Sequence, residues 1–207
     1  DACTTGTGTA VGANALGALT VGLNNTAVGT SALAAITTGT DCTAVGYQAL
    51  LVNTTNANTA VGSGAMDACT TGTGTAVGAN ALGALTIGLR HTAVGTSALA
   101  AITTGADCTA LGYQALIANT TDGNTAVGSG AMDACTTGTG TAVGANALGA
   151  LTTGLRHTAV GTSALGGVTT GTDNIGLGHA AGVNITTGSR HTAVGTSALA
   201  AITTGAD

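Results

Sequence analysis

The sequence lacks most of the residues from which globular proteins build a core and a charged surface. It has no Pro, Trp or Phe, its only aromatic residues are Tyr47 and Tyr113, and just 5% of its 207 residues are charged, with no Lys and no Glu. An average globular domain is about 25% charged. The scarcity of basic residues argues against binding to nucleic acid or to an anionic membrane surface.

Long apolar runs are missing as well, although 44% of the residues are hydrophobic. Thr, Gly and Asn interrupt every apolar stretch within a few residues, so no segment of about 20 apolar residues exists that could be inserted in a membrane. Disordered chains combine low hydrophobicity with high charge, and this chain has neither property. The sequence therefore predicts an ordered chain without a conventional globular core. Because it opens in the middle of a motif at Asp1, we expect it to be a fragment of a longer chain.

What the sequence does have is an internal repeat. The tetrapeptide Thr-Ala-Val-Gly, with small variations, begins twelve times between Thr9 and Thr192. Successive copies begin at intervals of 17, 17, 16 and 16 along the chain, and this pattern has a period of 66, so that segments 1–66 and 67–132 are identical at 57 of 66 positions. We therefore expect residues 1–207 to form one continuous repeat array with the superrepeats 1–66, 67–132 and 133–207.

Alignment of the copies gives columns of one residue type. The template is Thr-Ala-Val-Gly-x-x-Ala-Leu-x-x-Z-Thr-Thr-Gly, where Z is apolar and two or three polar residues follow. We interpret three columns as buried: the Val of the tetrapeptide, the Leu or Met of Ala-Leu, and Z. The Gly after Thr-Thr is replaced by Asn56 and Asp122, which predicts a left-handed turn there. The Gly after Val is never replaced, so that position is expected to require the missing side chain itself.

A repeat unit of this length, with two short strands and two corners, is typical of one turn of a parallel β-solenoid. The Ala-Leu stretches are too short to be stable helices. We therefore predict an all-β fold, a parallel β-solenoid or β-roll with turns ~4.8 Å apart. Three buried aliphatic side chains per turn contribute ~5–8 kcal/mol, whereas ordering the backbone of a turn costs about 16–30 kcal/mol. This imbalance favours burial against other copies, and we expect a trimer.

The repeat resembles two known families. Segments 25–29, 58–62 and 124–128 (Asn-Thr-Ala-Val-Gly) are similar to the shaft repeats of bacteriophage tail-fibre proteins, and segment 10–15 is similar to the head repeats of trimeric autotransporter adhesins. The adhesin repeats are shorter than the repeat units of this chain. The resemblance implies a β-roll, homotrimeric and extracellular, on a virion appendage or a cell-surface filament. It transfers no functional residue, because these repeats have none.

Five cysteines fall into two columns, namely Cys3, Cys69 and Cys135, and Cys42 and Cys108. Members of one column are four turns apart, about 19 Å, which is too far for a disulfide. Three arrangements remain open. Cys42–Cys69 and Cys108–Cys135 could form disulfides while Cys3 pairs with an upstream residue, the bonds could join different chains, or Cys69 and Cys135 could be small apolar members of the third column.

Four Asn-x-Thr sequons begin at Asn24, Asn53, Asn119 and Asn184. If the source glycosylates its proteins, we expect sugar chiefly at Asn53 and Asn119, because these residues interrupt the third apolar column as if they were turned outward.

Other polar residues that could carry chemistry are repeated and isolated. Arg-His pairs at 90–91, 156–157 and 190–191 stand just before the tetrapeptide, and we interpret them as a solvated corner. Single Asp residues recur without the further oxygen ligands that Ca²⁺ needs, and the repeated Ser residues have no recurring base nearby. The sequence predicts no enzyme, no cofactor and no metal site.

The function expected from this pattern is that of a structural segment, a shaft or spacer, in an extracellular fibre or filament that self-associates. Two alternatives stay open. One is an ice-binding or ice-nucleating type of solenoid, for which the Thr-x-Thr pattern at 5–9 recurs only once per superrepeat. The other is a receptor-binding adhesin head that contacts a cell-surface glycan or receptor, with segment 175–191 as the most irregular unit.

Overall fold

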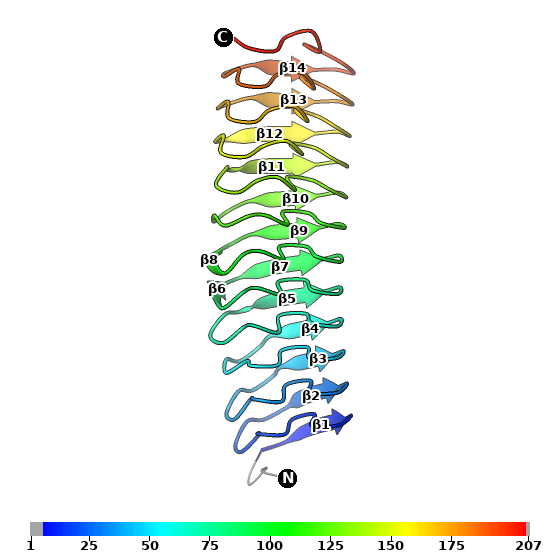
Figure 1. Cartoon of the computed structure of the whole chain (residues 1–207), viewed down its shortest axis with the longest axis vertical. Coiled ribbons are helices and arrows are strands. Elements are labelled where there is room, and N and C mark those ends of the chain that lie inside the picture. Colours follow the sequence, from blue (N-terminus) through cyan, green and yellow to red (C-terminus); the bar gives the residue numbers. More distant parts are fainter. Residues whose placement is uncertain (1–5, 206–207) are drawn as a thin grey trace. The chain divides into compact units, whose positions relative to one another are not determined.

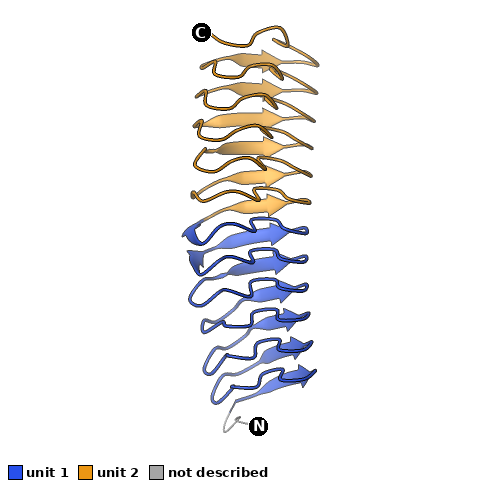
Figure 2. Cartoon of the chain, viewed as in Figure 1, with its two compact units in different colours: residues 1–106 blue, residues 107–207 orange. Residues whose placement is uncertain are grey.

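A computed structural model describes residues 6–205 of the chain and divides it into two compact units, residues 1–106 and 107–207 (Figure 2). Within the described residues every regular element is a β-strand and there is no helix, so none that could span a membrane. Each unit is a parallel β-solenoid in which hydrogen bonds between turns join positions 16 or 17 apart, which confirms the predicted fold class. Cys3 lies outside the described residues.

Unit 1 stacks one short strand per turn into a parallel sheet (Figure 1). Neighbours pair in the order β1-β2-β3-β4-β5-β7, each Thr opposite the Thr of the next turn. A second sheet contains only β6 and β8. The strands are β1 (Gly8–Val11), β2 (Asn25–Val28), β3 (Thr43–Val45), β4 (Thr59–Val61), β5 (Gly74–Val77), β6 (Ile87–Leu89), β7 (His91–Val94) and β8 (Thr104–Ala106).

Unit 2 repeats this arrangement with six parallel strands in the order β9-β10-β11-β12-β13-β14. Where unit 1 has the β6–β8 sheet, unit 2 has an isolated bridge between Leu155 and Thr172. The strands are β9 (Thr109–Leu111), β10 (Thr125–Val127), β11 (Gly140–Val143), β12 (His157–Val160), β13 (Ile175–Leu177) and β14 (Thr192–Val194).

The side of each strand that faces the core is the opposite of the one that we predicted. Side chains alternate between the two faces of a strand, and in β2 to β4 the Ala (Ala27, Ala44, Ala60) is fully buried. The Val of the tetrapeptide, predicted to be buried, lies on the outer face; Val11 and Val160 are 57% and 41% exposed. The interior next to this column is narrow: at Gly176, in the Ala column, even a Cβ would lie 2.8 Å from Leu165 Cγ.

The Ala-Leu segment closes the turn without forming the second strand that we predicted. It is a series of turns in which the buried Leu has a left-handed backbone, with φ of 48° at Leu33 and 49° at Leu50. A positive φ is unfavourable for a bulky residue. It is maintained here because the Leu33 N–H donates to the Ala49 carbonyl of the next turn, and because the side chain is fully buried.

The two glycine columns have different roles. The Gly after Val has φ between +118° and +142°, and a Cβ at Gly46 would collide with the carbonyl of Gly62 in the next turn. This confirms that the position requires the missing side chain. The Gly after Thr-Thr has the expected positive φ in only two described copies, Gly105 (+104°) and Gly205 (+125°). Where Asn56 and Asp122 replace it, the left-handed residues are the ones that follow, Ala57 and Gly123.

Candidate functional site

In each unit, the position one residue before the tetrapeptide holds a buried polar side chain in several turns, and Gly or Cys in the others. These buried polar residues include Asn25, Asn58, His91, Asn124, His157, Asn174 and His191. Asn58 shows the geometry: its Nδ2 donates to the Gly72 carbonyl at 3.0 Å, and its Oδ1 accepts the Gly74 N–H at 2.8 Å. A side chain with both contacts therefore clamps the corner of the next turn; among the described residues, His191 Nε2 lacks such a partner. We call this set the polar clamp column.

His157 performs this role with an imidazole. Its Nε2 lies 2.8 Å from the Gly171 carbonyl, and the Asn174 N–H donates to its Nδ1 at 3.3 Å. Nε2 is therefore the protonated nitrogen and the ring is neutral. Burial, as the largest cause, lowers the pKa of His157 below its ordinary value. The prediction of a solvated Arg-His corner was thus wrong for the histidines, because strand alternation turns the residue before Thr inward together with Ala.

The four described cysteines are buried free thiols, so neither Cys42–Cys69 nor Cys108–Cys135 is bonded in the structure. Asn53 is the residue of the third column that lies next to Cys42, with its Nδ2 3.4 Å from Cys42 Sγ. Cys69 is the residue of the same column one turn later. Burial raises the pKa of Cys69 and of Cys135 to about 11, which keeps both thiols protonated. Cys69 and Cys135 fill the third column as small apolar residues.

Two of the four predicted glycosylation sites are inaccessible. Asn53 and Asn119 are fully buried, and Asn53 Oδ1 accepts a hydrogen bond of 2.9 Å from Asn58. They interrupt the apolar column as internal hydrogen-bonding residues and are not turned outward as we predicted. Asn24 and Asn184 are exposed, so these two sequons are the accessible ones.

The residue just before the polar clamp column, for example Asn24 or Arg156, has a left-handed backbone. Its polar or charged side chain lies on the outside of the turn. Asp173 accepts two hydrogen bonds of 2.7 Å from Arg156, one from Nε and one from a terminal nitrogen. The equivalent pair in unit 1 is uncharged on one side, with Asn24 Nδ2 donating to Asp41 Oδ1 at 3.0 Å. Both contacts join successive turns at the surface.

The outer face of each main sheet presents Thr and Val side by side on successive strands. We call this the sheet face. Within the described residues, the structure has no hydrogen bond to the hydroxyl of the Thr in any of these strands, for example Thr43 or Thr75. The first Thr of most Thr-Thr pairs differs, because its hydroxyl donates to the backbone carbonyl at the same position of the next turn, as Thr70 does to the Thr86 carbonyl at 3.0 Å.

Apolar side chains are also exposed at one corner of unit 1. Val21 and Leu23 are 51% and 44% exposed, and Ile87 and Leu89, at the equivalent positions of the next superrepeat, are 59% and 44% exposed. We call these four residues the apolar corner. The aromatic side chain Tyr47 is exposed elsewhere in unit 1.

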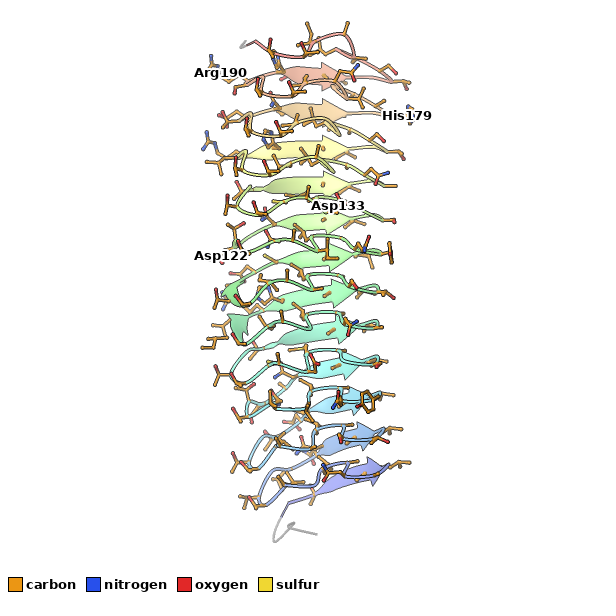
Figure 3. The ribbon with its side chains drawn as sticks, in the orientation of Figure 1. Asp122, Asp133, His179 and Arg190 are labelled. Atoms are coloured by element: carbon orange, nitrogen blue, oxygen red, sulfur yellow. The ribbon has the colours of Figure 1, made fainter. Side chains whose placement is uncertain are left out.

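Titratable side chains do not converge on a reaction centre in the described part of the chain. Residues 6–205 contain no group of three or more His, Cys, Asp or Glu that could hold a metal ion. In unit 2, Asp122 and Arg190 lie at one edge and His179 at the opposite edge (Figure 3). The candidate functional features are therefore surfaces, namely the sheet face and the apolar corner.

Two features of the repeat pattern were not predicted from the sequence, namely the buried polar clamp column and the outward position of Thr and Val. The alternation of side chains places the residue before Thr on the same side as Ala, so a buried Ala column would have predicted the polar clamp column. The same alternation puts Thr and Val together on the outside.

No protein-family model matches the chain, and neither a curated protein nor a solved structure gives a match.

Proposed function

We propose that this chain is a structural spacer of an extracellular fibre, and that it self-associates. The observation that carries the proposal is the continuity of the hydrogen-bond network between turns. The backbone strands pair in register, the Thr-Thr column donates along the axis, and the polar clamp column does the same inside. A turn held on every side by its neighbours is suited to transmitting distance and load, because it has no loose segment.

Resistance to proteolysis follows from the same features. The chain has no Lys and only three Arg, so trypsin has few sites, and the backbone of each turn is hydrogen-bonded to the next. An extracellular location is consistent with the resemblance to fibre shaft repeats and with the accessible sequons at Asn24 and Asn184.

Self-association is proposed to occur through the apolar corner. Exposed apolar groups that recur at a fixed interval are typical of a contact surface, and a second copy of the chain carries the same groups at the same interval. The occupant that fits this spacing is therefore another copy of the chain.

The test is cryo-electron microscopy of filaments of the full chain together with native mass measurement. We expect an oligomer whose turns are ~4.8 Å apart along the fibre axis. The double variant Ile87→Asp/Leu89→Asp is expected to lower the oligomer mass, whereas the control Thr30→Asp/Thr96→Asp, at exposed positions just after β2 and β7, is not. A wild-type chain that stays monomeric at all concentrations would contradict self-association.

A further inference from the structure

The sheet face is a two-dimensional array of identical groups. In unit 1, Thr26 pairs with Thr43 and Val28 with Val45, and the same register continues through Thr59 and beyond. Successive turns are ~4.8 Å apart, and Thr and Val of one strand are ~6.6 Å apart. Unit 2 repeats the array from β9 to β14, with Leu at two Val positions and Ile at one Thr position.

The array is rigid and its hydroxyl groups are not used by the protein. Thr and Val are β-branched, so their side chains are held close to one rotamer and the methyl groups keep fixed positions. Thr75, Thr92 and Thr141 are exposed, and no described residue hydrogen-bonds to their hydroxyls. Each turn except that of β13, where Ile175 replaces Thr, therefore offers one hydroxyl and several methyl groups at the same place.

The chemistry of the sheet face limits what can bind to it. Its outward positions hold no charged and no aromatic residue, so it has neither the ionic groups that bind anions and cations nor a stacking surface for sugars. It has no irregular feature that would fix the register of a folded protein. The matching partner is itself neutral, regularly spaced and rich in hydrogen-bonding groups.

We propose that the sheet face binds the surface of crystalline water, that is, ice. The methyl groups order the adjacent water and the Thr hydroxyls hydrogen-bond to it, so that the water layer on the protein continues the lattice. Each turn binds weakly, but the turns of a unit act together because one rigid backbone links them. The sheet face has Thr-Ala-Val, with Val at the position of the second Thr of a Thr-x-Thr motif, and Val retains the methyl groups. The local Thr-x-Thr pattern at 5–9 is therefore not required.

This inference is independent of the proposed spacer function, because it concerns a different surface from the apolar corner. A chain could bind ice as a monomer or within a fibre. The experiment below therefore measures ice binding and oligomer mass separately.

The experiment grows ice slowly from a solution of the full chain and measures how much protein the ice contains, relative to a globular protein of similar mass. The recrystallisation rate of small ice grains is measured alongside. We expect the wild-type chain to be enriched in ice and to slow recrystallisation. The variant Thr59→Tyr/Thr125→Tyr, which places one bulky group on the sheet face of each unit, is expected to lose most of both effects.

The matched control is Thr38→Tyr/Thr137→Tyr, at exposed second positions of Thr-Thr pairs, and it should behave like the wild type. Circular dichroism and thermal melting establish that all chains are folded. The proposal is overturned if the wild-type chain is no more enriched than the globular protein, or if the sheet-face variant is enriched as strongly as the wild type. It is likewise overturned if the sheet-face variant changes only the oligomer mass, because the face would then be a contact between copies.

Discussion

Equivalent corners in the two units fulfil one structural role with different chemistry. In unit 1, Asn25 donates to the Gly39 carbonyl at 2.7 Å and accepts the Cys42 N–H at 3.0 Å. In unit 2, two superrepeats later, His157 makes the corresponding two contacts with Gly171 and Asn174. A polar side chain at this position therefore supplies one donor and one acceptor at a set separation, which both an amide and a neutral imidazole provide.

The comparison also shows where the two units differ. The imidazole can take up a proton and the amide cannot, so the corner at His157 depends on pH while the corner at Asn25 does not. Outside the same corner, unit 2 has the Arg156–Asp173 ion pair where unit 1 has the Asn24–Asp41 hydrogen bond. Substitutions between superrepeats thus keep the backbone arrangement of the corner. They change how the stability of the corner depends on pH and salt.

The largest loss of stability is expected at the Gly that follows Val, because both units need a residue without a side chain there. Gly46→Ala in unit 1 and Gly112→Ala in unit 2 each place a Cβ against the carbonyl of the Gly in the next turn, at φ of +139° and +142°. Each is expected to lower the free energy of unfolding by more than about 3 kcal/mol. Urea denaturation measures the loss. Gly123→Ala is the control, because a Cβ there meets nothing within 4 Å, and it should cost about 1 kcal/mol. Equal losses at Gly123 and Gly112 would contradict the close-approach argument.

The second largest loss of stability is expected when the clamp side chain is removed, at Asn25 in unit 1 or at His157 in unit 2. Asn25→Leu and His157→Leu each leave one carbonyl and one N–H buried without a partner. We expect a loss of about 2–5 kcal/mol for either variant. The exchange His157→Asn should cost much less, since Asn makes the same pair of contacts at position 25. Chemical denaturation at pH 8, where the imidazole is neutral, makes the two units comparable. A Leu variant as stable as the wild type would show that the clamp is dispensable.

The third effect is pH dependence, which separates the two corners. Because burial lowers the pKa of His157 in the folded chain below 6.5, the unfolded chain binds its proton at higher pH than the folded chain does. The stability is therefore fully present above about pH 6.5 and is lost as the pH falls below it. Thermal midpoints between pH 8 and pH 5 should fall less for His157→Asn than for the wild type, and more for Asn25→His. An unchanged pH profile in His157→Asn would contradict a neutral buried imidazole.

The smallest effect is expected for the ion pair. Arg156 lowers the pKa of Asp173, but both side chains are largely in contact with solvent, so screening by water and salt reduces their attraction. Arg156→Gln should shift the urea midpoint less than any variant above, and the shift should disappear in about 1 M salt. The converse change Asn24→Arg brings the pair to unit 1 and should raise its midpoint slightly at low salt. A large or salt-independent shift would show that the pair is more than a surface contact.

Much of the candidate site was hidden from sequence reasoning for an identifiable reason. The array of exposed Thr hydroxyls could not be recognised while Val was assigned to the core, because that assignment turned Thr inward as well. Asn53 and Asn119 were predicted to be glycosylated because polar residues in an apolar column suggested exposure. They are buried instead, since neighbouring Thr and Asn side chains and the Thr55 and Thr121 carbonyls satisfy them.

The repeat pattern alone established the length of a turn, the parallel in-register stacking and the absence of helices, because a short repeat that contains β-branched segments has few other ways to pair its backbone. The three-dimensional structure was needed to decide which face of each strand lies inside. Strand alternation separates Ala from Thr and Val, but it does not say which group is buried. The packing of the interior decides that, because Ala in the strand lies against buried Leu where even a Cβ at Gly176 would be crowded, and Asn or His one residue before Thr is buried with hydrogen bonds to the next turn.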